Sequence, residues 1–154
     1  MIQALELKIP PLVLVTLFAL AMWLLTLVVP AVTLPAVWHL VLAGIFAISG
    51  AGVALAGVLA FRRANTTVDP RVPQQSSSLV IRGIYRYSRN PMYLGFLLLL
   101  LALTCYLMNV AAMALLPLFV LYMNRFQIVP EERFLLQKFG ADYQAYCERV
   151  RRWL

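Results

Sequence analysis

Two long runs of the chain contain no charged residue. Lys, Arg, Asp and Glu are absent from Ile9 to Phe61 and again from Asn90 to Asn124. A transmembrane helix needs about 20 predominantly apolar residues, at roughly 1.5 Å of rise each. The first run therefore holds two such helices, and the second run, slightly extended, holds two more. We predict spans at residues 11–29, 36–61 (or from Pro35), 91–108 and 110–129.

The composition supports this all-α integral membrane fold. Hydrophobic residues make up 63% of the 154 positions and charged residues only 12%, whereas soluble domains carry about 25% charged residues. We predict one membrane domain over residues 1–154. It divides into two N-terminal spans (1–61), a cytoplasmic loop and interfacial segment (62–90), a helical hairpin (91–129) and C-terminal amphipathic helices (130–154). Within the second part, residues 65–78 are rich in Thr, Pro, Gln and Ser and read as a loop.

The positive charges give the orientation. All 13 Lys and Arg lie on one side of the predicted membrane: Lys8 before the first span, six between spans two and three, and six at or beyond the end of span four. The short turns on the other side, near residues 31–34 and Asn109, have none. The positive-inside rule therefore places both termini and the central loop in the cytoplasm. Topology and contact with anionic lipid headgroups explain the net charge of +7, which gives no reason to invoke nucleic acid.

Small residues are frequent in the second predicted span. Such residues let neighbouring helices approach closely in lipid. We therefore interpret them as a helix-packing face, in preference to a ligand groove. Its glycines are Gly44, Gly50, Gly52 and Gly57.

The residue types that bind metals are scarce. Cys105 and Cys147 have no metal-ligand spacing and no partner residues nearby, so we expect neither a disulfide nor a metal site. The single histidine, His39, falls on the side of the membrane away from the other polar residues. We interpret it as an interfacial residue.

The first segment with unusual chemistry precedes the third span. Asn90 directly before Pro91 is typical of a helix start, with Asn as the cap and Pro at the first helical position. A helix N-terminus can also bind a carboxylate or phosphate. Arg82, Arg86 and Arg89 are spaced i, i+4 and i+7, so they would share one face if the segment is helical.

The second segment follows the fourth span. Glu131 and Glu132 come after a proline, which is again typical of a helix start, and the sequence beyond them is amphipathic. We therefore predict a C-terminal interfacial helix, with a break and restart near Gly140. Arg125 falls at the end of the span, where a charge costs up to about 3 kcal/mol unless it reaches the interface or finds a partner. Glu131 or Glu132 is the partner we expect.

Together these two segments resemble the signature of the integral membrane methyltransferases. That family comprises the isoprenylcysteine carboxyl methyltransferases and the related phospholipid methyltransferases, and its pattern is Arg-His-Pro-x-Tyr-x-Gly followed, after a helical hairpin, by Glu-Glu. Here residues 89–95 read Arg-Asn-Pro-Met-Tyr-Leu-Gly and residues 131–132 read Glu-Glu. The similarity extends from about residue 65 to residue 153. One departure is that Asn90 replaces the family histidine, so an acid or base role at that position is lost.

The resemblance implies S-adenosylmethionine as methyl donor, bound without a Rossmann domain between the cytoplasmic ends of spans three and four. Glu131 and Glu132 would hold its ammonium group or ribose hydroxyls, and Gly95 would permit close approach. Arg125, or another nearby arginine, would orient an anionic acceptor. The residues implied to line the donor are Arg89, Asn90, Pro91 and Tyr93.

The implied reaction is an in-line methyl transfer to a lipophilic, lipid or lipidated acceptor that enters from the bilayer. A carboxylate acceptor needs no base, so catalysis would come mostly from alignment, which can supply ~7 kcal/mol or more. An amine acceptor would need a base, for which a glutamate such as Glu132 is the candidate. Two other functions stay open from the sequence: an NADPH-dependent membrane reductase that uses the same arginines, and a non-catalytic membrane adaptor.

Overall fold

The computed structural model describes residues 6–32, 35–64 and 79–154, and every regular element in these ranges is helical. The loop predicted at 65–78 lies outside the described residues. The helices are α1 (Pro11–Leu25), α2 (Ala36–Arg63), a 3₁₀ turn η3 (Gly83–Arg86), α3 (Pro91–Leu107), α4 (Val110–Met113), α5 (Leu115–Met123), a π-helical turn η4 (Asn124–Ile128) and α6 (Val129–Arg149).

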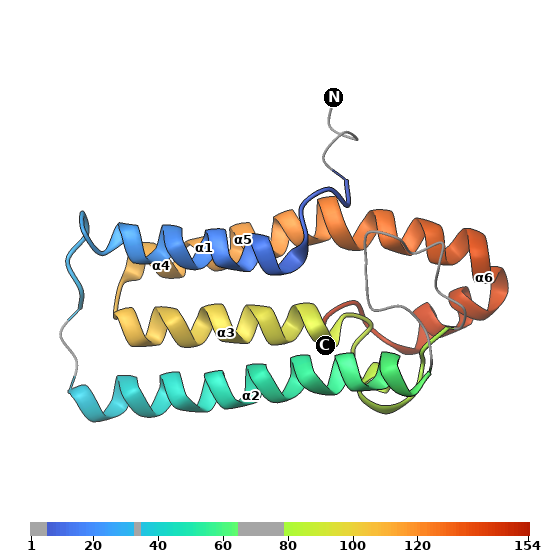
Figure 1. Cartoon of the computed structure of the whole chain (residues 1–154), viewed down its shortest axis with the longest axis horizontal. Helices are drawn as coiled ribbons and strands as arrows, with labels where there is room; N and C mark the ends of the chain where they lie inside the picture. The colour runs from blue at the N-terminus through green and yellow to red at the C-terminus, as the bar shows by residue number, and fades with distance from the viewer. Residues whose placement is uncertain (1–5, 33–34, 65–78) are drawn as a thin grey trace.

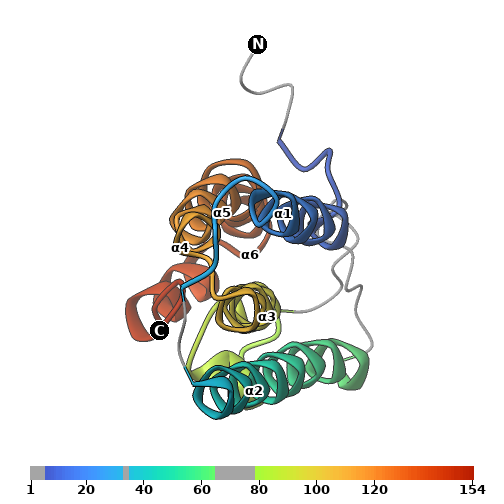
Figure 2. The same cartoon turned by 90° about the vertical axis from the view of Figure 1, so that its left-hand side faces the viewer.

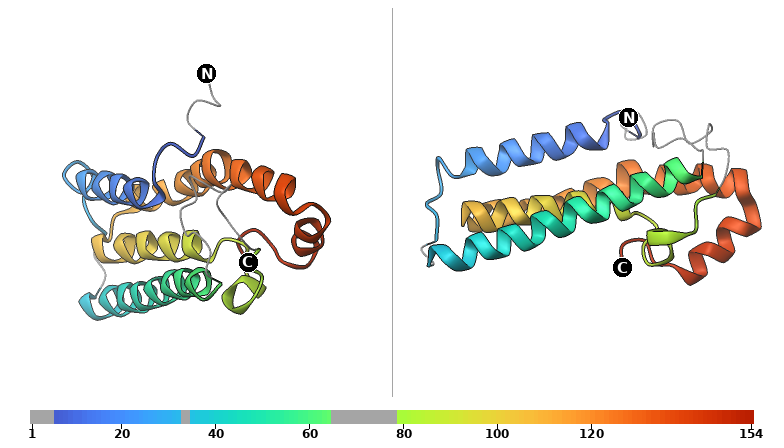
Figure 3. Two further views of the ribbon diagram at one scale, coloured as in Figure 1. Left: turned by 45° about the vertical axis from the view of Figure 1, so that its right-hand side comes forward. Right: turned by 60° about the horizontal axis from the view of Figure 1, so that its bottom comes forward.

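The long helices form a bundle in which α3 is central. Figure 1 shows α1, α2, α3 and α5 running side by side, with the turns from α1 to α2 and from α3 to α4 at one end. Figure 2 looks along the bundle and shows α3 between α2 on one side and α1 with α5 on the other. At the opposite end α6 extends beyond the bundle and then folds back, so that the C-terminus lies near the start of α3 (Figure 3).

Two stretches are long and apolar enough to cross a membrane, Val37–Arg63 and Val110–Arg149. The other two predicted spans are apolar helices of only 15 and 17 residues, shorter than the ~20 needed. Turns after α1 carry its apolar segment on to Val29, and the left-handed backbone of Met108 ends α3. The structure therefore supports two spanning helices, and the number four stays a prediction.

Local sequence signals explain where several of the helices begin. Pro11 and Pro91 each occupy the first helical position, where the missing N–H costs nothing. Asn109 caps the next helix, since its side-chain oxygen accepts a hydrogen bond of 3.0 Å from the Ala112 N–H. Its amide nitrogen donates to the Val29 carbonyl at 2.7 Å. The predicted turn at Asn109 is thus confirmed, and it also ties α3 and α4 to the end of α1.

A seam of small residues joins α2 to α3. A Cβ atom placed on Gly50 would lie 2.8 Å from the Gly95 carbonyl oxygen, and one on Gly95 would lie 2.7 Å from the Ala54 nitrogen. Gly57 meets the Met92 side chain in the same way. Gly52 has nothing within 4 Å, so it lies off the seam. The predicted packing face is confirmed for the two glycines that meet α3.

Apolar side chains fill the interior and also cover the outside. Phe119 and Met123 of α5 pack with Leu14 and Met22 of α1 and with Leu100 of α3 in the buried core. Many large apolar side chains point outward from α1, α2 and α5, which suits contact with lipid chains. Examples exposed by half or more are Leu12, Leu17, Trp23, Ile45, Ile48 and Leu121.

The last long stretch changes helix type twice. The π-helical turn η4 precedes Pro130, whose missing N–H cannot continue an α-helical ladder. At Gly140 the backbone leaves the helical region with φ +51°. The predicted break at Gly140 is confirmed, and it is what allows α6 to turn back toward the bundle.

Candidate functional site

The two unusual segments of the sequence meet at the charged end of the bundle. Tyr93, in the first turn of α3, donates a hydrogen bond from its hydroxyl to Glu131 Oε2 at 3.1 Å. Glu131 stands in the first turn of α6. Two positions separated by 38 residues are therefore held together through a buried tyrosine.

A cavity of about 60 Å³ opens at this contact. Arg89, Asn90, Tyr93 and Glu131 supply its polar lining. The rest of its wall is aromatic or apolar and consists of Phe61, Leu79, Val80, Tyr85, Met92, Ile128, Leu135, Tyr143 and Tyr146. The volume is enough for a small number of water molecules and far below the roughly 300–1,000 Å³ typical of ligand pockets.

Burial changes the chemistry of the Glu131 carboxyl. Glu131 lies beyond the apolar part of its helix, keeps partial exposure as a residue and lines the cavity. Its surroundings raise the pKa of the carboxyl to about 7, chiefly through loss of solvent. The hydrogen bond from Tyr93 opposes this rise in pKa, and the negative charge of Glu132 adds to it.

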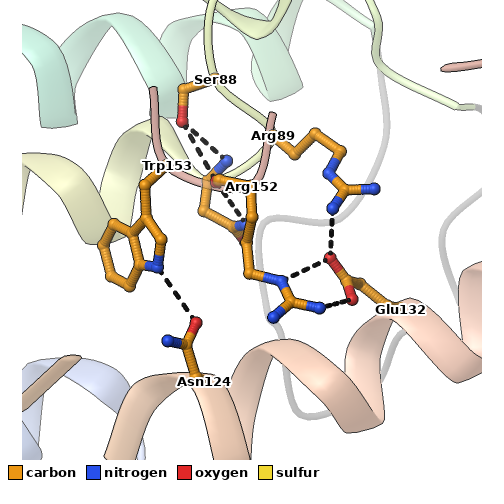
Figure 4. A network of polar contacts seen from close by, with 7 residues as sticks. Ser88, Arg89, Asn124, Glu132, Arg152 and Trp153 are labelled. Atoms are coloured by element: carbon orange, nitrogen blue, oxygen red, sulfur yellow. Dashed lines mark hydrogen bonds and ion pairs between the residues drawn. The ribbon is translucent and has the colours of Figure 1, made fainter. Parts of the chain in front are cut away.

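Glu132 has a different environment because two arginines hold it. Arg152 donates from Nε to Oε1 at 3.1 Å and from Nη2 to Oε2 at 2.7 Å. Arg89 Nη2 lies 3.1 Å from Oε1. The three side chains form the ion-pair network of Figure 4. Arg89 Nε is buried and has no hydrogen-bond partner among the described residues, so one strong donor of this network is left for a ligand.

The end of the chain covers the start of α3. The Arg89 N–H donates to the Arg151 carbonyl at 3.0 Å, and Asn90 Nδ2 donates to the Arg152 carbonyl at 2.9 Å. Trp153 Nε1 donates to Asn124 Oδ1 at 3.0 Å, which fixes the segment to η4 (Figure 4). The C-terminal cover, residues 150–153, therefore lies over the cavity's polar wall.

The expected capping role of the Asn90 side chain is wrong. Asn90 precedes α3 as predicted, but its side chain makes no capping hydrogen bond. The amide nitrogen is engaged with the Arg152 carbonyl instead. The backbone N–H of Asn90 donates a hydrogen bond to Ser88 Oγ at 3.1 Å. The side chain thus links α3 to the C-terminal cover.

The expected partner of Arg125 is also wrong. Arg125 Nη1 lies 2.7 Å from Glu6 Oε1, and Arg133 Nη2 lies 2.6 Å from Glu6 Oε2. Hydrogen bonds from these guanidiniums, first that of Arg125, lower the pKa of the Glu6 carboxyl. Leu7 donates its N–H to the Phe126 carbonyl at 3.0 Å. We call this contact of residues 6–9 with residues 125–133 the N-terminal clip.

The remaining predicted site residues lie at the border of the cavity or away from it. Pro91 is fully buried at the start of α3, and Gly95 lies in the seam with α2. Arg125, Glu132, Pro91 and Gly95 are not among the residues that line the cavity. The structure therefore brings together Arg89, Asn90, Tyr93 and Glu131 directly, with Glu132 behind them.

The arginines before α3 do not share one face. Only Gly83–Arg86 is helical, and it is a short 3₁₀ turn. Arg89 faces Glu132, whereas Arg82 and Arg86 line a separate groove. The spacing of i, i+4 and i+7 places residues on one face only in a continuous helix, and residues 87–90 are not helical.

Three cavity tyrosines were not identified as site residues from the sequence. Tyr143 and Tyr146 fall within the predicted C-terminal amphipathic helix and Tyr85 falls within the segment before the third span, and neither pattern assigned them a role. Tyr146 donates its hydroxyl to the Tyr85 carbonyl at 2.7 Å, which fastens α6 to η3. Tyr143 and Tyr146 lie three residues apart, so the sequence could show that they share one face of a helix. It could not show that Tyr146 contacts Tyr85, 61 residues away.

Comparison with known proteins identifies a matching family and a relative. A family model described as phospholipid methyltransferase matches residues 38–142. An uncharacterized protein of Haemophilus influenzae is 49% identical over 63 residues, which is 41% of this chain and 100% of that protein. No solved structure matches the chain.

Proposed function

The chain belongs to the phospholipid methyltransferase family, and on that premise we propose that it transfers a methyl group from S-adenosylmethionine to a lipophilic acceptor at the membrane surface. The observation that carries the proposal is the meeting of the Arg89–Gly95 segment with Glu131 at one cavity. Because the family acts as methyltransferases, the chain is expected to be an enzyme.

The polar groups of the cavity fit the charges of such a donor. S-adenosylmethionine carries a carboxylate, an ammonium group and a sulfonium. The unpartnered Arg89 Nε is a donor suited to the carboxylate. Glu131 offers a carboxyl group to the ammonium or a hydroxyl, and the ring of Tyr93 gives an aromatic wall. When bound, the donor supplies an electrophilic methyl group.

The size of the cavity requires a movement. At about 60 Å³ it does not hold a nucleoside. The element best placed to move is the C-terminal cover, since the polar contacts that hold it are hydrogen bonds with Arg89, Asn90 and Asn124 and the ion pair of Arg152 with Glu132 of α6. In this proposal Glu132 holds Arg89 in position throughout, and Arg152 leaves when the site fills.

Glu131 is the residue we assign to proton transfer, in place of the Glu132 expected from the sequence. A general base works best when its pKa lies near the operating pH, and burial raises the pKa of Glu131 to about 7. An amine acceptor would lose its proton to this carboxylate before attack. Arg125 serves the N-terminal clip rather than the acceptor, because its guanidinium is paired with Glu6 and neither residue lines the cavity.

The membrane side follows from the positive charges. The described arginines gather at the end of the bundle that carries the cavity, around η3 and α6. By the positive-inside rule this end is cytoplasmic. The donor would then enter from the cytosol, and the acceptor from the bilayer.

Binding of S-adenosylhomocysteine to the purified protein, measured by calorimetry, tests the proposal. We expect saturable binding by the parent protein, about tenfold weaker binding by Glu131→Gln, and unchanged binding by Glu148→Gln, an exposed glutamate on the same helix. A parallel titration with NADPH separates the methyltransferase from the reductase. No binding of S-adenosylhomocysteine, or equal binding by both variants, would refute the proposal.

A further inference from the structure

A second, larger groove lies beside the cavity and is lined by three arginines. Its volume is about 560 Å³. Arg82 and Arg86 come from the segment around η3, and Arg149 comes from the end of α6. Ile81 and Val150 supply apolar surface between them. Tyr146 contributes to the walls of both the groove and the cavity.

The three guanidiniums are exposed, and among the described residues none of them forms an ion pair. Arg89, Arg125, Arg133 and Arg152 all form ion pairs with glutamates. By contrast, Arg82, Arg86 and Arg149 make no ion pair with any carboxylate of the described residues, and Arg149 Nε only reaches the Ala145 carbonyl of its own helix at 3.0 Å. The groove therefore gathers three guanidinium groups that are not engaged in ion pairs with the described residues.

The groove is held in shape by buried contacts. Gly83 adopts φ +64°, which lets the chain turn sharply between Arg82 and the rest of η3. Tyr85 is buried and packs edge-on against Phe61 with ring centres 5.3 Å apart. The hydrogen bond of 2.7 Å from Tyr146 to the Tyr85 carbonyl joins this turn to α6. The arginines therefore project from fixed backbone positions on both sides.

We propose that this groove binds the phosphate group of a membrane phospholipid. Guanidinium groups match phosphate oxygens in geometry and charge, and often bind them through paired hydrogen bonds. The groove lies at the charged end of apolar helices, where lipid headgroups are found, and its apolar positions Ile81 and Val150 suit the glycerol and upper chain region of a lipid. The inference does not depend on the proposed function, because it requires no donor and no reaction.

The test measures binding to the full-length protein in a non-ionic detergent by calorimetry. The probes are dioctanoyl-phosphatidylglycerol, dioctanoylglycerol, which lacks the phosphate, and inorganic phosphate. We expect the phosphatidylglycerol to bind at least tenfold more tightly than either of the others. The triple variant Arg82→Gln, Arg86→Gln, Arg149→Gln should weaken its binding about tenfold or more.

The matched control removes three exposed positive charges that do not line the groove, through Lys8→Gln, Arg62→Gln and Lys138→Gln. It should bind the phospholipid like the parent protein. Equal weakening in both triple variants would overturn the proposal, since the effect would then come from net charge. Equal binding of dioctanoylglycerol would overturn it in favour of a purely apolar site, and equal binding of inorganic phosphate in favour of a free-phosphate site.

Folding is checked independently. Far-ultraviolet circular dichroism and binding of S-adenosylhomocysteine should be unchanged in the groove variant if the parent protein binds that ligand. Should the triple variant not fold, the single variant Arg86→Gln, at an exposed position, should still weaken phospholipid binding by several-fold. Unaltered binding by that single variant would then count against the proposal.

Discussion

The seam between α2 and α3 makes a sharp prediction for the substitution Gly50→Ala. The added Cβ would lie 2.8 Å from the Gly95 carbonyl oxygen and 3.0 Å from the Leu99 nitrogen. Both are backbone atoms, so no side-chain rotation relieves the overlap and the two helices must separate. Overpacking of this kind costs about 1–3 kcal/mol. Replacing Gly by Ala within a helix stabilises it by roughly 0.5–1 kcal/mol. The mid-points of the two ranges leave a net loss of about 1 kcal/mol.

Gly52→Ala is the matched control, since it makes the same chemical change two residues further along α2. Gly52 is exposed and a Cβ there meets nothing within 4 Å. This variant should therefore be as stable as the parent, or slightly more stable.

The assay is unfolding in mixed micelles with increasing sodium dodecyl sulfate, followed by circular dichroism. Gly50→Ala should unfold at a lower detergent fraction than the parent, and Gly52→Ala should not. If the two variants unfold together, α2 does not pack on α3 through Gly50, and the close approach of the helices described above is incorrect.

Three further predictions concern the polar contacts. Tyr93→Phe removes the hydrogen bond that lowers the pKa of Glu131, so the pKa should rise further above about 7; an unchanged midpoint in the pH dependence of methyl transfer would contradict this. Asn90→Ala should lose about 1 kcal/mol with the hydrogen bond to the Arg152 carbonyl, and Asn90→Asp should lose at least as much because a carboxylate oxygen then faces that carbonyl. Thermal unfolding checks both, and an Asp variant as stable as the parent would indicate a helix cap after all. Glu6→Gln should be less stable than the parent at pH 7. The folded-state pKa of Glu6 is lowered, so its contribution is present above the unfolded-state pKa and is lost as the pH falls through the folded-state value. The two stability curves should therefore converge in acid, and a constant gap would exclude the carboxylate as the cause.

Features encoded by neighbouring residues were predictable from the sequence. The starts at Pro11 and Pro91, the turn at Asn109 and the break at Gly140 follow from the conformational limits of Pro, Asn and Gly. The lengths of the helices were harder to predict, because each apolar run extends beyond the residue at which the helical backbone ends. Met108 is an example, since it is apolar yet left-handed.

Partners distant in the chain were not predictable. The two arginine partners of Glu6 lie 119 and 127 positions away, and the acceptor of the Asn90 amide lies 62 positions away. The sequence suggested partners that are nearer in the chain. For Arg125 these were Glu131 or Glu132, and for the Asn90 side chain they were the first N–H groups of α3. Which partner each side chain contacts depends on how α6 folds back, and the packing of the whole bundle determines that.

The N-terminal clip has a consequence for biosynthesis. Residues 6–9 are made before the bundle helices, yet their partners Arg125, Gln127 and Arg133 leave the ribosome more than a hundred residues later. Gln127 is fully buried and donates to the Ile9 carbonyl at 2.6 Å, so neither group finds this partner while the earlier helices insert. Contacts of such long sequence separation form late. The clip therefore closes only after the start of α6 has been made, so the N-terminal residues wait for it while α1 to α5 are already in place.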